Sequence, residues 1–316
     1  MRFLRVASLT ALLFGMMLYP RHPSSASSSS TIFLPIVLQQ STPYLAFTGA
    51  PAFGDSNIFV AEVTGAQVKQ VTSSIADEYD PTWSPDGTRI AFATRQRAPT
   101  GMYTSTVNLM DRDGTNVLTL TTELAWDFIR GVTWSPDSTC LAFASYRDIN
   151  YEIYTVMSDG SQVSRLTMNN VFDGEPTWSP DSTHLAFIST RDNDNREIYM
   201  MQADGAQQQR ITTTAADEFE PAWSPDGQRL AFTRNYRTIY VRNLQDDVET
   251  PIFTKEIDDY AAMGVSWSPT GQQLAFTEST MRYGHIVVMN VDGTPSAPFT
   301  NPPDVTYSSD PAWTSR

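Results

Sequence analysis

Short runs of β-branched and aromatic residues, separated by turn residues, recur along most of the chain. Runs such as Glu152–Met157 and Glu197–Met201 favour strands, because their side chains suit a pleated, half-buried surface. Asp-Gly pairs follow several of these runs and predict tight hairpins, since Gly accepts positive φ. The pattern lacks helical spacing and predicts an all-β unit of four short strands, labelled a to d. The Asp-Gly pairs join c to d at Asp113-Gly114, Asp159-Gly160, Asp204-Gly205 and Asp292-Gly293.

One stretch of this pattern repeats with a fixed internal spacing. From Trp223 to Phe232 it reads Trp-Ser-Pro-Asp-Gly-Gln-Arg-Leu-Ala-Phe, and in five copies the Phe follows the Trp by nine positions. Ser-Pro-Asp joins strand a to strand b, with proline fixing φ for a turn. A period of 44 to 51 residues with an aromatic signature is typical of β-propeller blades. The repeated tryptophans are Trp83, Trp134, Trp178, Trp223, Trp267 and Trp313.

Each end of the repeat array holds half a unit. Asp310–Trp313 begins a unit whose Phe does not follow, whereas Tyr44–Phe47 is the second half of a unit with no Trp before it. Together the two halves complete a sixth blade. We therefore expect a six-bladed propeller of four-stranded antiparallel blades, closed by pairing of the N- and C-terminal strands. Closure in this way hides open sheet edges that would otherwise favour aggregation.

The N-terminal residues are typical of an export signal. Arg2 and Arg5 precede the apolar run Val6–Tyr19, and a polar tract of small residues follows. We expect residues 1–30 to form a signal peptide and Ser-rich leader, residues 31–43 an apolar linker, and residues 44–316 the propeller. The apolar run is too short and wrongly flanked for a stable transmembrane helix. Cleavage near Ala26 predicts a soluble periplasmic or extracellular protein, and an uncleaved signal anchor is the alternative.

Charge narrows the classes of partner. The chain has 35 acidic and 21 basic residues, a formal net charge of −14. Nucleic acids and anionic membrane surfaces require a basic footprint, so this charge disfavours both. We expect a monomer that has a protein partner and needs no cofactor.

The repeats resemble those of the TolB-like propeller family, also described as WD40-like or PD40 repeats. That family's repeats read roughly Trp-Ser-Pro-Asp-Gly, then Ile/Leu-Ala-Phe, Arg-Asp, Ile-Tyr and Asp-Gly, and the segments 145–160 and 189–205 are similar to them. The resemblance implies a six-bladed propeller. TolB itself has an additional N-terminal α/β domain, for which this sequence has no room between the signal and the first blade. We therefore expect the propeller alone. Propellers have many functions, so the resemblance says less about function than about fold.

Motifs for catalysis are missing from the sequence. The chain has no Gly-x-Ser-x-Gly nucleophile elbow, which the hydrolase domain of some peptidase propellers would require. Of its three histidines, His22 lies in the leader, whereas His184 and His285 lie two blades apart and make a poor metal or triad pair. Lyase propellers that use a histidine-bound metal need ligands that this chain lacks. We expect no catalytic residue and no metal site built from histidine.

One constellation of polar residues suggests a site. Strand a is the innermost strand of a propeller blade, so the third residue before each Trp should lie in a ring near one channel mouth. Four of the six are acidic, and we predict that they bind a partner or a cation such as calcium. Alternatively, they are structural and accept hydrogen bonds from nearby loops or pair with the b–c loop residues Arg95, Arg97, Arg147, Arg191, Arg234 and Arg237. The six ring positions are Asp80, Gly131, Glu175, Glu220, Gly264 and Asp310.

Large aromatic residues in the d–a loops favour a binding role at the same mouth, since such residues are enriched at protein interfaces. We predict an extracytoplasmic, non-catalytic module that binds or scaffolds protein. Two alternatives are a hydrolase or lyase with an acidic channel site and a carbohydrate-binding propeller. The loop aromatics are Tyr79, Trp126, Phe128, Phe172, Phe219 and Tyr260.

Overall fold

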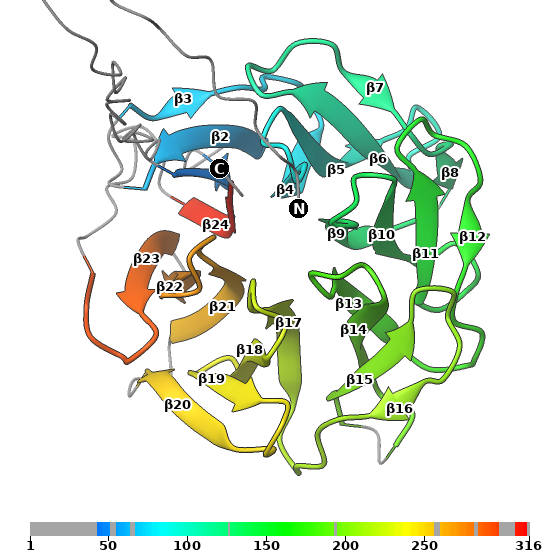
Figure 1. Ribbon diagram of the computed structural model, residues 1–316. Helices are drawn as coiled ribbons and strands as arrows, with labels where there is room; N and C mark the ends of the chain where they lie inside the picture. Colours follow the sequence, from blue (N-terminus) through cyan, green and yellow to red (C-terminus); the bar gives the residue numbers. More distant parts are fainter. Residues whose placement is uncertain are drawn as a thin grey trace, which may run out of the picture. The chain divides into compact units, whose positions relative to one another are not determined.

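Figure 1 shows the computed structural model, in which the β-sheet blades are arranged in a ring, each with its first strand nearest the centre. The structure describes residues 43–50, 55–63, 67–125, 127–192, 195–255, 260–280, 284–296 and 307–314. The predicted export signal and nearly all of the predicted linker lie outside these residues. Within the described ranges, no helix has the length and apolar character needed to span a membrane.

Blades 1 to 3 each have four antiparallel strands, ordered in the sheet from the innermost, a, to the outermost, d. Blade 1 carries one further short strand, β8, that pairs with β6. The strands are β4 (Asp77–Trp83), β5 (Arg89–Arg97), β6 (Tyr103–Asp111), β7 (Leu118–Thr119) and β8 (Leu124–Ala125) in blade 1; β9 (Ile129–Trp134), β10 (Cys140–Ser145), β11 (Glu152–Met157) and β12 (Ser164–Arg165) in blade 2; and β13 (Asp173–Trp178), β14 (His184–Ser189), β15 (Glu197–Gln202) and β16 (Gln209–Arg210) in blade 3.

Blades 4 to 6 follow the same plan. In blade 5, a bridge between Met289 and Pro295 marks the outer edge of the described strands. The strands are β17 (Glu218–Trp223), β18 (Arg229–Arg234), β19 (Thr238–Asn243) and β20 (Glu249–Thr254) in blade 4; β21 (Tyr260–Trp267), β22 (Gln273–Thr280) and β23 (Gly284–Asn290) in blade 5; and β24 (Tyr307–Trp313), β1 (Tyr44–Ala50), β2 (Asn57–Glu62) and β3 (Lys69–Gln70) in blade 6.

The ring closes between the two ends of the array. Strand β24 is the innermost strand of blade 6 and pairs antiparallel with β1, with Leu45 opposite Trp313 and Ala46 opposite Ala312. Blade 6 therefore combines one C-terminal strand with three N-terminal strands. The predicted all-β, six-bladed fold and its mode of closure are confirmed.

In blades 1 to 4 the a–b turn is held by its own Ser-Pro-Asp residues. In blade 1, the Ser84 hydroxyl donates to Asp86 Oδ1 at 2.6 Å and accepts from Arg89 N at 2.9 Å. Asp86 Oδ1 also accepts from Thr88 N at 3.0 Å. Aspartate side chains that bond to the backbone two residues ahead favour such turns. The turn thus leads the chain directly into strand b.

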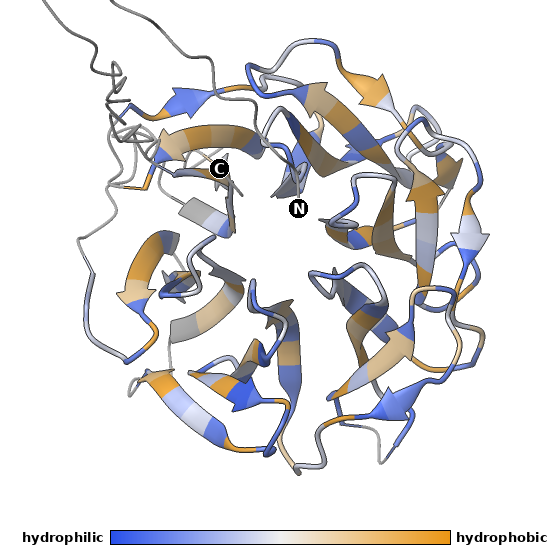
Figure 2. Cartoon of the chain, viewed as in Figure 1, coloured by the Kyte–Doolittle hydropathy of each residue, from blue (hydrophilic) through white to orange (hydrophobic). Residues whose placement is uncertain are grey.

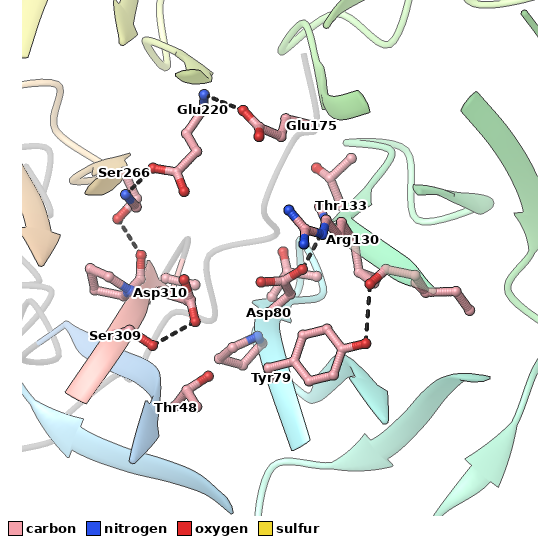
Figure 3. A pocket seen from close by; sticks show the side chains of 18 of the residues that line it. Thr48, Tyr79, Asp80, Arg130, Thr133, Glu175, Glu220, Ser266, Ser309 and Asp310 are labelled. Carbon is pink, nitrogen blue, oxygen red and sulfur yellow. Dashed lines mark hydrogen bonds between the residues drawn. The ribbon is translucent and has the colours of Figure 1, made fainter. Parts of the chain in front are cut away.

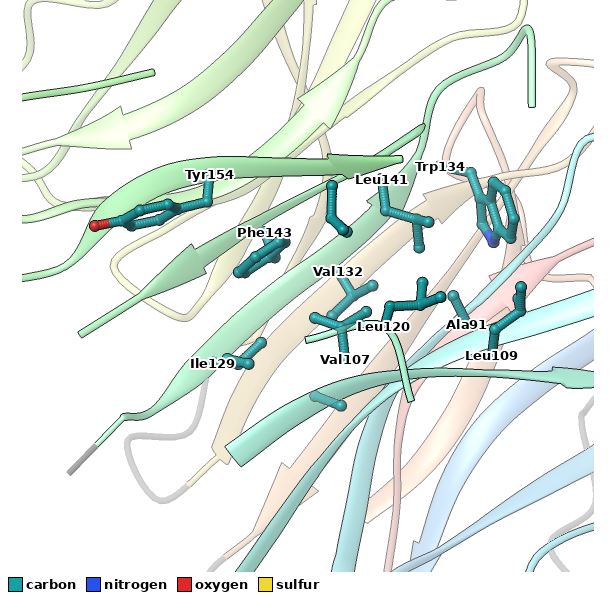
Figure 4. Close-up of a cluster of buried hydrophobic side chains, with 12 residues drawn as sticks. Ala91, Val107, Leu109, Leu120, Ile129, Val132, Trp134, Leu141, Phe143 and Tyr154 are labelled. Atoms are coloured by element: carbon teal, nitrogen blue, oxygen red, sulfur yellow. The ribbon is translucent and has the colours of Figure 1, made fainter. Parts of the chain in front are cut away.

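The core lies between neighbouring blades and inside them. In the first interface, Trp134 of blade 2 packs with Leu109 of blade 1 and with Leu141 and Phe143 of its own blade (Figure 4). Five of the repeated tryptophans are buried, whereas Trp223 is half-buried. In Figure 2, middle strands such as β6 and β11 carry the hydrophobic colour, whereas the outer strands β3 and β16 are hydrophilic. The strand-b phenylalanines are fully buried and are Phe47, Phe92, Phe143, Phe187, Phe232 and Phe276.

Candidate functional site at the channel mouth

The innermost strands all bulge at the predicted ring. In every blade the a–b register shifts beside the ring residue, as a β-bulge requires. All six ring residues have left-handed backbones, with φ between 52° and 67°. Glycine adopts this conformation freely, whereas a side-chain-bearing residue loses about 1 kcal/mol or more. The bulge was not predicted from the sequence, although Gly131 and Gly264 at equivalent positions were its signal.

The ring acids connect one blade to the next through the backbone (Figure 3). Asp80 Oδ2 accepts a hydrogen bond from Gly131 N at 2.7 Å, and Glu175 Oε2 accepts one from Glu220 N at 2.7 Å. Glu220 Oε2 accepts from Gly264 N in the same way. Asp310 instead accepts from the Ser309 hydroxyl at 2.7 Å. The structure therefore brings all four predicted acids to one mouth and pairs three of them with the equivalent residue of the following blade.

Burial and mutual repulsion favour protonation of these carboxyl groups. Burial and the charge of Asp310 raise the pKa of Asp80 to about 7. Burial and the charge of Glu175 raise the pKa of Glu220 well above its ordinary value. Burial also raises the pKa of Asp310 and of Glu175. At neutral pH the ring thus carries fewer than four negative charges.

The b–c loop arginines pair with other acids. Arg95 contacts Asp77 at 2.9 Å, directly across the β4–β5 pair, and Arg234 contacts Glu218 at 2.6 Å, across the β17–β18 pair. Arg147 and Arg191 pair likewise with Asp127 and Asp173, at 3.1 and 2.8 Å. Arg97 Nε donates to the Gly101 carbonyl, and Arg237 lies in the b–c turn of blade 4. If the ring acids were structural, these arginines were expected to pair with them. Those that form ion pairs here do so with acids nearer the loops.

Aromatic side chains form a row around the mouth on the face that carries the b–c and d–a loops, here the mouth face. Phe128 contacts Tyr103 and Tyr146, with ring centroids 6.4 and 6.3 Å apart, and Tyr151 contacts Tyr146 and Phe172 at 5.3 and 5.4 Å. Beyond Phe172 the row continues through the side chain of Arg196 to Phe219 and Tyr236. We call it the aromatic rim, and its members are Tyr103, Phe128, Tyr146, Tyr151, Phe172, Phe219 and Tyr236.

Arg196 is the cation that completes the rim. Its guanidinium lies 4.9 Å from the ring of Phe172 and 4.8 Å from that of Phe219, on which Tyr236 stacks at 3.7 Å. Arg–aromatic stacking of this kind is favourable and leaves the charge available. Four rim members, Tyr103, Tyr146, Tyr151 and Tyr236, were missed because they lie in or beside b–c hairpins rather than d–a loops. Of the aromatics predicted there, Tyr79 donates its hydroxyl to the Ile129 carbonyl, and the side chains of Trp126 and Tyr260 lie outside the described residues.

A cavity of about 590 Å³ opens at the mouth. The four ring acids line it together with Arg130, Tyr151 and hydroxyl groups such as that of Thr133 (Figure 3). This volume is in the range of small-molecule sites. Among the described residues, no group of three or more His, Cys, Asp or Glu is arranged to hold a metal ion. His184 contacts Thr183, and His285 contacts Glu278 at 3.0 Å.

Comparison with known proteins places the repeats in a family. The family model of the TolB beta propeller domain matches residues 129–315, which is more than half of the chain. The chain belongs to the TolB beta propeller domain family. The predicted resemblance is thereby confirmed. TolB from Acinetobacter baumannii has a similar structure, with a TM-score of 0.71 and 21% identity over 86% of this chain and 66% of that one.

Other structures show that the TolB-like propeller shape also occurs in enzymes. An oligogalacturonate lyase from Vibrio parahaemolyticus matches 70% of this chain and 68% of its own, at 14% identity and a TM-score of 0.53. A puromycin-hydrolyzing peptidase from Mycobacterium tuberculosis matches 80% of this chain and 43% of its own, at 14% identity and a TM-score of 0.57. At these identities the likeness shows the fold alone, so function must be argued from the site.

Proposed function

We propose that this TolB-like propeller is a non-catalytic protein-binding module that works outside the cytoplasm and binds its partner through the mouth face. The aromatic rim carries the proposal, because it runs without a break from blade 1 to blade 4. Tyr103, Tyr146 and Tyr236 each keep about two fifths of their area exposed, at 41%, 38% and 41%. Aromatic residues and arginine are the residue types most enriched in the energetic centres of protein interfaces.

Export from the cytoplasm rests on the sequence. The basic N-terminus, the short apolar run and the small-residue tract favour a cleaved signal. The test is N-terminal sequencing of the protein recovered outside the cytoplasm, with a first residue near Ser27 expected. Recovery of a chain that retains Met1 would instead support the signal anchor.

The ring acids give the mouth an electrostatic role in this proposal. A basic group of the partner, or a cation such as calcium, would offset the repulsion among the ring acids and the cost of burying their charge. The test is the double variant Glu175→Gln with Glu220→Gln, which preserves shape and hydrogen-bond acceptors. The matched control is Asp246→Asn with Asp247→Asn, an equal change of formal charge in the exposed c–d turn of blade 4, on the opposite face.

The assay is capture of partners from envelope extract by immobilised protein, with thermal melting measured with and without calcium. We expect the wild type and the control to capture the same partner and the ring variant to capture less. Unchanged capture and an unchanged calcium response in the ring variant would leave the ring a structural role only. Failure of the wild type to capture protein, with binding on a glycan array, would favour the carbohydrate alternative.

A further inference from the structure

Exposed apolar side chains gather on one arc of the mouth face, over blades 1 and 2. Ile149 and Met168 have 89% and 78% of their area exposed. Their loops are joined, because Asn150 Nδ2 donates to the Asn169 carbonyl at 3.1 Å. Leu124 lies beside the strand that begins at Tyr103, since it pairs with Ser105. We call this surface the apolar arc; its members are Tyr103, Leu124, Tyr146, Ile149 and Met168, all at least 38% exposed.

Ile149 differs from the rest of the arc because its backbone is strained and its side chain makes no buried contact that would stabilise the fold. Its φ is +70°, a left-handed conformation that a β-branched side chain adopts only under strain. Its side chain is nevertheless exposed, so buried contacts do not repay the strain. The loop is held from below, where Asn150 Nδ2 also donates to the Val171 carbonyl at 2.7 Å. Strain that the surroundings impose on an exposed loop residue points to a function for that residue.

Two exposed arginines flank the arc. Arg97 is directly opposite Tyr103 in the β5–β6 hairpin, and the guanidinium of Arg130 lies 5.5 Å from the ring of Tyr151. Within the described part of the chain, neither forms an ion pair, whereas neighbouring Arg95 and Arg147 do. Acidic residues outnumber basic ones by 35 to 21. The charge of Arg130 also acts on the ring, where it counteracts part of the rise in the pKa of Asp80 and of Glu175.

We propose that the apolar arc docks an extended segment of a partner protein whose apolar side chains are flanked by carboxylates. This inference rests on the proposed function and specifies the chemistry of the partner. Apolar side chains of the segment cover Ile149 and Met168, and its carboxylates pair with Arg97 and Arg130. Hydrogen-bonded arginine–carboxylate pairs fix the register of a bound segment and disfavour partners of the wrong charge. The net charge of −14 opposes the other surface that an apolar, arginine-flanked patch would suit, an anionic membrane.

Three labelled 12-residue peptides test the chemistry by fluorescence anisotropy. All carry the same Leu and Phe residues, and the intervening positions are Glu in the first peptide, Gln in the second and Lys in the third. We expect the Glu peptide to bind roughly tenfold or more tightly than the Gln peptide, and the Lys peptide more weakly than both. Arg97→Gln with Arg130→Gln should remove the advantage of the Glu peptide. The control, Arg112→Gln, changes an exposed arginine of the opposite face and should leave binding unchanged.

Ile149→Asn tests the location, because asparagine adopts the left-handed conformation readily. We expect its melting temperature to equal or exceed that of the wild type and its affinity for the Glu peptide to fall roughly tenfold. The control is Val163→Asn, at a 45% exposed position on the opposite face. A lower melting temperature of Ile149→Asn would show a structural role and overturn the proposal.

Equal affinity for all three peptides, no binding of any peptide, or preferential binding to phosphatidylglycerol vesicles would also overturn it. A further comparison separates this inference from the proposed function. If the Ile149 and arginine variants capture the same envelope partner as the wild type, the proposal that the apolar arc docks the partner is refuted, whereas the proposed protein-binding function stands. If the wild type captures no protein, both fail.

Discussion

Trp313→Ala should open the ring at its closure. Trp313 is 8% exposed and packs with Leu45 and Phe47 of blade 6 and with Ile286 of blade 5. A tryptophan buries about 200 Å², which at about 25 cal/mol per Å² is worth about 5 kcal/mol. Its Nε1 makes no hydrogen bond within the described structure, so the substitution loses packing only. Measured large-to-small changes support a loss of about 3–5 kcal/mol.

Urea unfolding followed by circular dichroism measures this loss. Whole domains are stable by about 5–15 kcal/mol, so the expected change is a large fraction of the total. The matched variant is Trp178→Ala, at the equivalent, 7% exposed position of blade 3. We expect similar losses of free energy but different weak points. Limited proteolysis should cut first in blade 6 for Trp313→Ala and first in blade 3 for Trp178→Ala.

Two outcomes would refute this reasoning about closure. A loss of only a few tenths of a kcal/mol, as for a surface substitution, would mean that Trp313 does not hold β24 against β1. First cuts at the same place in both variants would mean that each tryptophan does not stabilise its own blade locally.

Three further predictions follow from the mouth. The ring acids have raised pKa values in the folded state, so the stability they contribute is present at low pH and is lost as the pH rises through about 7. The melting temperature should therefore be higher at about pH 5.5 than at about pH 8. The substitution Asp80→Asn should reduce this difference. Gly131→Ala should lower the melting temperature, because φ is +62° and the new Cβ would lie 3.0 Å from the backbone of blade 3; an unchanged melting temperature would contradict this. Arg234→Ala should cost about 3–5 kcal/mol in urea unfolding, since it leaves the fully buried carboxylate of Glu218 without its partner, whereas Arg95→Ala, in an exposed pair, should cost less than about 1 kcal/mol.

The fold followed from the sequence because its information repeats. A nine-residue Trp–Phe spacing recurs in every complete copy, so the core and the blade number depend on no single residue. The half-units at Tyr44 and Asp310 predicted the closure for the same reason. The exception is Trp223, which shares the spacing and yet is half-buried. Spacing reports the position in a blade, whereas exposure depends on the neighbouring blade.

The site was predicted in part. The position of Asp80, Glu175, Glu220 and Asp310 followed from strand order alone, and the structure gathers them at one mouth. Their partners did not follow, because a backbone N–H leaves no mark in the sequence. Some of the arginine–carboxylate pairs could have been predicted from the strand register, since Arg234 lies directly opposite Glu218 in the a–b hairpin. The aromatic rim depends on contacts between neighbouring blades. The sequence of a single repeat gives no information about such contacts.

The left-handed bulge limits how the channel can vary among related sequences. At Gly131 and Gly264 an added Cβ would meet the backbone of the next blade at 3.0 and 3.3 Å, which keeps both positions small. At the other four positions the backbone favours Gly, Asn and Asp, and the structure accommodates Glu. Exchange of an acid for its amide preserves both the shape and the acceptor atom. Related sequences can therefore differ in the number of acids at the mouth, from zero to four, without a change in the backbone of the propeller.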